Sequence, residues 1–175
     1  IEVFGRSGAA GGSSSSGDIF ISHGQDSRGT VRSDMHLVTL PSPLNMLVMG
    51  QVHGPIRDFT VGEPHALQLG GSAITLSDQL VLYGGCYANG MCPQQDTWLF
   101  DFSRRHWRYM SRGHSPRIRP CLASAFPSRD LAPDLDAHHT VILWGGLERG
   151  KHYIRVDKAS PFEIDVLDTA RKTWT

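Results

Sequence analysis

The chain is 175 residues long, which is enough for a single domain with a sizeable core, and it carries 17 basic and 17 acidic residues. Zero formal charge gives no global attraction to nucleic acid or anionic lipid, and no apolar run approaches the ~20 residues of a membrane span, so neither partner is expected. The 19 glycines and 10 prolines favour many turns and short strands over long helices.

The first part of the chain, residues 1–58, predicts a unit of short strands. Its candidate strands are residues 1–4, 18–21, 35–40 and 45–50, the last of which would be the outer strand. Residues 8–17 are small and polar, and they fit either a flexible linker or a weak inner strand. The second candidate strand leads into His23-Gly24, where the later units have two glycines.

The second unit, residues 59–116, shows the full pattern. Its candidate strands are residues 71–76, 80–83 and 96–102. A Ser-Asp turn joins the first two strands, and the second strand ends in Gly84-Gly85. An irregular polar loop, the third strand and a basic turn then lead to Trp107.

The third unit, residues 117–175, repeats this order. Its candidate strands are residues 121–126, 139–144 and 162–168, with a proline-containing insertion between the first two. The second strand ends in Gly145-Gly146, and a basic turn after the third leads to Trp174. We therefore expect up to four short strands in each unit, the third and fourth joined by a tight turn.

The spacing of the landmarks supports a repeat. The last glycines of the units, Gly24, Gly85 and Gly146, are separated by equal intervals of 61 residues. Downstream, an apolar residue, an aspartate and a tryptophan recur at the same spacing in Phe100, Asp101 and Trp107 and in Leu167, Asp168 and Trp174. A repeated chain segment of this length indicates a stack of similar supersecondary units.

Each landmark has a physical reason. Glycine alone reaches positive φ without a Cβ clash, so Gly84 and Gly85 permit a sharp exit from a crowded strand. Asp101 can accept backbone N–H bonds in an Asx-type turn. Trp107 can lie between one four-stranded sheet and the next, where a buried indole contributes ~3–5 kcal/mol relative to alanine.

These landmarks resemble the kelch repeat, in which paired glycines are followed by an aromatic residue, six intervening residues and a tryptophan. The residues that carry the resemblance are Gly84, Gly85, Phe100 and Trp107, and Gly145, Gly146, Leu167 and Trp174. The first unit departs from the pattern at His23 and has no tryptophan, and the third has Leu167 in place of the aromatic residue. The resemblance implies an all-β fold, a kelch-type β-propeller whose blades each have four antiparallel strands.

About three blades fit in this chain, whereas propellers close with ~4–8. Three blades alone would expose two sheet edges and two apolar faces. We therefore expect residues 1–175 to form part of a larger propeller. The remaining blades would come from the parent chain or from a partner chain.

The candidate partner-binding residues lie in the linkers between units and in the loops after the glycine pairs. In kelch-type propellers these segments surround one mouth of the central channel. The candidates are Arg117, Arg119, Tyr87, Asn89, Arg149 and Tyr153. Arginines there could bind a carboxylate or an acidic peptide, so the leading expectation is a protein–protein interaction or scaffold module without enzymatic activity.

The alternative is an enzyme, either a galactose oxidase-like copper oxidase or a propeller attached to a catalytic domain elsewhere. The histidines and cysteines that could be imagined as a metal site are His138, His139, His152, Cys86, Cys92 and Cys121. They lack the paired spacing of metal motifs, so neither a metal nor another cofactor is expected.

Three cysteines, an odd number, favour a reducing compartment, cytoplasmic or nuclear, and no targeting segment is visible. Pairing of Cys86 with Cys92 stays open.

Overall fold

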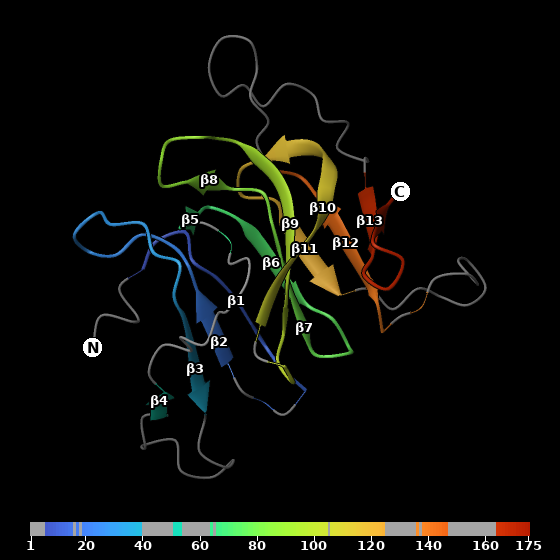
Figure 1. Cartoon of the computed structure of the whole chain (residues 1–175), viewed down its shortest axis with the longest axis horizontal. Helices are drawn as coiled ribbons and strands as arrows, with labels where there is room; N and C mark the ends of the chain where they lie inside the picture. The colour runs from blue at the N-terminus through green and yellow to red at the C-terminus, as the bar shows by residue number, and fades with distance from the viewer. Residues whose placement is uncertain are drawn as a thin grey trace.

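In the computed structural model of the chain, the described residues are 6–15, 17, 19–39, 51–53, 64, 66–104, 106–124, 136, 138–146 and 164–175. These residues are all-β, as expected, with three four-stranded antiparallel sheets and one two-stranded ribbon (Figure 1). The described part forms no helix, and so no helix that could cross a membrane.

The first sheet has the strand order β1-β2-β3-β4. Its strands are β1 (Ala10–Ser13), β2 (Ile19–Ser22), β3 (Met35–Thr39) and β4 (Gln51–His53). The small, polar segment near the start thus contains β1, at one edge of this sheet, and is not a linker. The outer strand is β4, whereas residues 1–4 and 45–50, for which strands were predicted, lie outside the described residues.

The second sheet has the order β10-β9-β7-β6. Its strands are β6 (Gly71–Ile74), β7 (Gln79–Tyr83), β9 (Gln94–Asp101) and β10 (His106–Arg117). A ribbon of β5 (Leu67–Gln68) and β8 (Cys86–Tyr87) lies beside this sheet. Strand β10 continues to Arg117 through two register shifts, so part of the predicted linker belongs to a strand.

The third sheet has the order β11-β12-β13-β14. Its strands are β11 (Cys121–Ser124), β12 (Thr140–Trp144), β13 (Ile164–Asp168) and β14 (Thr173–Trp174). Figure 1 shows the three sheets side by side in chain order, with the C-terminus beside the third.

The first strands of the three sheets, β1, β6 and β11, are edge strands that lie next to one another, and serines connect them. We call them the inner strands. Ser72 Oγ accepts a hydrogen bond from Gly11 N (2.9 Å) and donates one to Gly11 O (2.8 Å). Ser124 Oγ donates to Ile74 O in the same way between the second and third sheets. A Cβ on Gly71 would lie 2.5 Å from Pro120 O, so glycine permits this close approach.

Two apolar cores fill the spaces between the sheets. The first contains side chains from the first and second sheets, among them Phe20, Met35, Leu80, Phe100 and Trp107. The second contains side chains from the second and third sheets, among them Val81, Leu99, Val141 and Leu167. The second sheet therefore buries alternate residues against different neighbours, with Leu80 in the first core and Val81 in the second.

The turns and doublets have the predicted geometry. Asp101 Oδ1 accepts bonds from the backbone N of Ser103 (3.0 Å) and Arg104 (3.1 Å), and Asp168 repeats this turn in the third sheet. The doublet residues with positive φ are Gly84 (69°), Gly85 (89°), Gly145 (64°) and Gly146 (89°). His23 has the same left-handed conformation (φ 59°) before Gly24 (84°).

Candidate functional site

The segments that lead into the inner strands lie against the glycine doublets. Gly85 N donates to Arg117 O (2.7 Å), and Arg119 N donates to Leu69 O (2.8 Å). Leu69 N in turn donates to Gly8 O (2.9 Å), so backbone bonds join the three lead-in segments. We call this region, which comprises these segments and the described loops after the first and second doublets, the doublet end.

One predicted partner-binding residue, Arg117, is buried and holds two sheets together. It is 3% exposed. Its Nη1 donates to Gly145 O (2.8 Å), and its Nη2 donates to Asp165 Oδ2 (3.1 Å) in the third sheet. Its guanidinium therefore lies inside the protein, whereas the sequence predicted a position in an exposed loop.

Arg6, for which the sequence predicted no role, has the matching place before the first sheet. Its Nη1 donates to His23 O (3.2 Å), the first carbonyl of that doublet, and its Nη2 donates to Asp34 Oδ2 (2.6 Å). The sequence carries no signal for this match, because the positive φ two residues after each arginine, at Gly8 and Arg119, appears only in the structure.

The buried His23 and His36 and the half-buried Asp34 lie together beside the first doublet. Burial alone would raise the pKa of Asp34, but hydrogen bonds from Arg6 and His36 and the charge of Arg6 outweigh burial and lower that pKa to about 2. Burial also lowers the pKa of the His23 imidazole to about 4. At neutral pH the site thus contains an Asp34 carboxylate and a neutral His23.

Tyr87, another predicted contact residue, is also buried. Its OH donates to Asp96 Oδ2 (2.6 Å) at the start of the long strand β9. Burial, followed by this hydrogen bond, raises the pKa of the Tyr87 phenol well above its ordinary value. Tyr87 therefore anchors its loop and does not present its ring to a partner.

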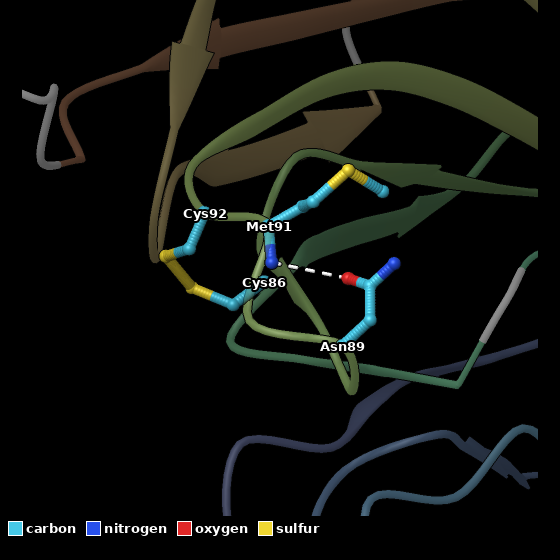
Figure 2. Close-up of a disulfide and its surroundings, with 4 residues drawn as sticks. All are labelled: Cys86, Asn89, Met91 and Cys92. Carbon is cyan, nitrogen blue, oxygen red and sulfur yellow. Dashed lines mark hydrogen bonds between the residues drawn. A yellow bond between two sulfur atoms is a disulfide. The ribbon is translucent and has the colours of Figure 1, made fainter.

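The loop after the second doublet carries some of the exposed groups of this region, and Figure 2 shows its residues Cys86, Asn89, Met91 and Cys92. A disulfide between Cys86 and Cys92 closes it, which resolves the pairing that the sequence left open. At the tip, Asn89 Oδ1 accepts a hydrogen bond from Met91 N (3.0 Å), and the Met91 side chain is 52% exposed.

Arg119 is exposed, unlike Arg117. Its backbone has φ 53°, and its N–H bonds Leu69 in the segment that pairs through β5 with β8 of the disulfide loop. Of the predicted contact residues, Asn89 and Arg119 are thus exposed at the doublet end, whereas Tyr87 and Arg117 are buried. Arg149 and Tyr153 lie outside the described residues.

Both structural tryptophans lie between sheets, as predicted. Trp107 packs edge-on against His23 of the first sheet, with ring centroids 5.5 Å apart. Trp174 lies 5.0 Å from the Tyr83 ring of the second sheet, and its Nε1 donates to Thr97 Oγ1 (3.1 Å).

The described residues contain no group of three or more His, Cys, Asp or Glu side chains that could hold a metal ion. The sulfur of Cys86 is bonded to Cys92, so it is not free for the tyrosine cross-link of a galactose oxidase-like centre. Nothing in the described part of the chain favours the copper-enzyme alternative over a binding role.

Comparison of the chain with protein-family models and with curated proteins found no match. What the chain does must therefore be inferred from its own residues and contacts.

Proposed function

We propose that the three sheets are blades of a kelch-type β-propeller and that the doublet end binds a partner protein or peptide. The propeller is supported by the repeated packing of one sheet on the next. Inner strands lie side by side, doublets recur after the second strand of each sheet, and Trp107 and Trp174 each extend to the sheet before their own. Such repetition is what a radial stack of blades requires.

The binding role is supported by the way in which the doublet end carries its exposed side chains. The backbone segments that carry them are held in place by hydrogen bonds and a disulfide. The disulfide and the Tyr87–Asp96 bond fix the loop that carries Asn89 and Met91. Backbone bonds fix the segment that carries Arg119. Preorganised contact groups lose little conformational entropy when a partner binds, which favours affinity.

The chemistry of these groups suggests the partner. Met91 offers a polarizable, adaptable apolar contact, and Asn89 lies beside it at the same tip. Arg119 offers a planar cation that can bind a carboxylate through two hydrogen bonds. Arg117 does not add to this charge, because its guanidinium is already paired with Asp165. We infer a peptide or protein segment that carries an acidic and an apolar side chain.

A displayed library of random peptides, selected on the full chain, tests this proposal. Selected peptides should be rich in acidic residues, and Arg119→Glu and Met91→Ala should each weaken their binding at least about fivefold. Arg104→Glu is the matched control, because it makes the same charge change in the exposed turn between β9 and β10, at the opposite end of the sheet.

Two results would contradict the proposal. One is a selection that returns no peptide above background. The other is binding that Arg104→Glu weakens as much as Arg119→Glu does, because binding would then follow overall charge and not the doublet end.

A further inference from the structure

The disulfide loop has an exposed tip, residues 88–91. This tip contains Asn89-Gly90, the one Asn-Gly pair in the sequence, whereas the other asparagine, Asn45, is followed by Met46. An asparagine side chain is an amide, and the backbone nitrogen of the next residue can attack its carbonyl carbon. A glycine at the next position has no side chain to hinder this attack. The tip therefore carries the pair of residues in this chain that is most suited to deamidation.

The surroundings of Asn89 favour attack on its side chain. A Cβ placed on Gly90 would have no atom within 4 Å beyond its chain neighbours, so the space around this residue is open. Asn89 Oδ1 accepts a hydrogen bond from Met91 N (3.0 Å), which Figure 2 shows. This bond polarises the side-chain carbonyl, because its N–H points at the oxygen on which negative charge develops during attack.

The closed loop restrains the nitrogen that would attack. Gly90 N donates to Tyr87 O (3.0 Å), and Tyr87 N donates to Met91 O (3.0 Å), so the tip is a hydrogen-bonded turn. Gly90 N must lose its proton and turn toward the Asn89 side chain, and both steps require its bond to Tyr87 O to open. The disulfide opposes this opening, because it ties the two ends of the turn together.

We propose that Asn89 is a deamidation site whose rate is controlled by the disulfide of its own loop. Gly90 N attacks Asn89 Cγ, the bond from Cγ to the side-chain nitrogen breaks, and the proton from Gly90 N leaves with that nitrogen as ammonia. Water then opens the cyclic imide at either carbonyl and gives aspartate or isoaspartate. The reaction is slow in the closed loop and faster after a dithiol reduces Cys86–Cys92 by exchange and is itself oxidised to a disulfide.

Deamidation changes the charge of the doublet end. It converts a neutral amide into a carboxylate beside Met91 on the exposed tip. An added negative charge repels a negatively charged partner, so an acidic peptide should bind more weakly after the reaction. This consequence rests on the proposed function, whereas the deamidation itself does not.

Peptide mapping of the full chain by mass spectrometry gives the first test. In a mildly alkaline buffer, Asn89 of the chain reduced with dithiothreitol should deamidate at least about fivefold faster than Asn89 of the disulfide-closed chain, the factor expected for one opened hydrogen bond. Asn45 is the internal control, because the Met46 side chain hinders attack there. Asn89→Gln should gain no such product, because its longer side chain would have to close a larger ring.

Two further samples separate loop opening from unfolding of the chain. Cys86→Ser with Cys92→Ser opens the loop without a reductant, and it should deamidate as fast as the reduced chain while circular dichroism shows that the sheets remain. A short peptide with the sequence of residues 87–91 has no restraint from the fold. Asn89 of the closed chain should react at least about fivefold more slowly than in this peptide, and this comparison holds even if the serine variant unfolds.

The effect on binding has a separate test. Asn89→Asp reproduces one product, and its carboxylate can still accept the bond from Met91 N. It should weaken the binding of acidic peptides selected on the full chain about two- to fivefold, the range for a charge interaction between exposed groups. Ala170→Asp is the matched control, because it adds the same charge to the exposed turn between β13 and β14, at the opposite end of the third sheet.

Three outcomes would overturn the proposal. One is equal deamidation at Asn89 in the closed and the reduced chain. Another is a closed chain that reacts as fast as the short peptide, because the loop would then impose no restraint. The third is deamidation at Asn89 that is no faster than at Asn45 in either form. A chain that deamidates as expected but binds no peptide would contradict the proposed function and not this modification.

Discussion

The two interfaces between neighbouring sheets use the same tryptophan position in different ways. Trp107, between the first and second sheets, is 2% exposed and packs on His23 and Phe100. Trp174, between the second and third sheets, is only half-buried, and its indole N–H bonds Thr97. The second interface also contains the buried Arg117–Asp165 ion pair.

This difference shows that one repeated position can serve two kinds of contact. At the first interface apolar burial dominates, because the indole is enclosed among rings. At the second interface the indole covers an edge, and polar bonds fix the sheets at the doublet end. A change at Trp107 should therefore lower the free energy of unfolding more than the same change at Trp174.

The largest effect is expected for Trp107→Ala. Loss of a fully buried indole and the resulting cavity should lower the free energy of unfolding by about 4 kcal/mol, measured by urea denaturation. Trp98→Ala is the control, because Trp98 is only half-buried and rests at the rim of the first core. Equal losses for the two variants would contradict the first interface as described.

The second interface can be broken through its ion pair. Arg117→Ala leaves the Asp165 carboxylate without this cation, and we expect a loss of about 3 kcal/mol in the free energy of unfolding. A double variant, Arg117→Leu with Asp165→Leu, removes both charges. Leucine is chosen because Leu67 has the equivalent position before the second sheet. It should recover most of the loss, and a double variant as unstable as the single one would disprove the pairing.

Acid should weaken the first interface through His23. The pKa of His23 is about 4 in the folded protein and 6.5 ordinarily, so between these values the unfolded chain binds more protons. Stability should then fall as the pH decreases from about 6.5 to 4, by no more than about 3 kcal/mol.

His23→Asn provides the comparison for this pH dependence, because asparagine tolerates positive φ and does not titrate. Its urea midpoint should fall less than that of the wild type over the same pH range. Parallel pH curves for the two proteins would contradict a buried neutral imidazole.

The smallest effect is expected for Trp174→Phe. This change keeps an aromatic ring near Tyr83 and removes the hydrogen bond to Thr97, so the free energy of unfolding should fall by about 1 kcal/mol. Thr97→Val removes the hydroxyl that accepts this hydrogen bond. The double variant should lower the free energy of unfolding no more than either single variant does. Additive losses would show that the two groups do not interact.

The sequence predicted the parts of the fold that depend on local chemistry. The doublets need positive φ, the aspartates before the basic turns accept neighbouring backbone N–H groups, and the tryptophans are too large for a solvated turn. Each of these requirements can be recognised within a few residues of the chain. The strand ends differ by a few residues at most in the second unit, for example at β6, which ends at Ile74 and not at Leu76.

The candidate site was predicted less well, because it depends on distant partners. Arg117 was expected to face solvent like other loop arginines, and its burial follows from Asp165, which lies 48 residues later. Arg6 pairs with Asp34 across 28 residues. From the sequence alone, a linker arginine that pairs with a distant carboxylate cannot be distinguished from one that faces solvent. Among the described residues, only Asn89 and Arg119 are exposed and remain as predicted contact residues.

The order of the sheets can be tested most directly with two pairs of cysteines. Ser15 donates hydrogen bonds to Asp78 across the first and second sheets (2.9 Å from its N). In a Cys121→Ser background, Ser15→Cys with Asp78→Cys should form an intrachain disulfide, seen by mass spectrometry, whereas Ser15→Cys with Asp136→Cys, in the corresponding turn of the third sheet, should remain as free thiols. A disulfide to position 136, or none to position 78, would contradict the side-by-side order of the three sheets.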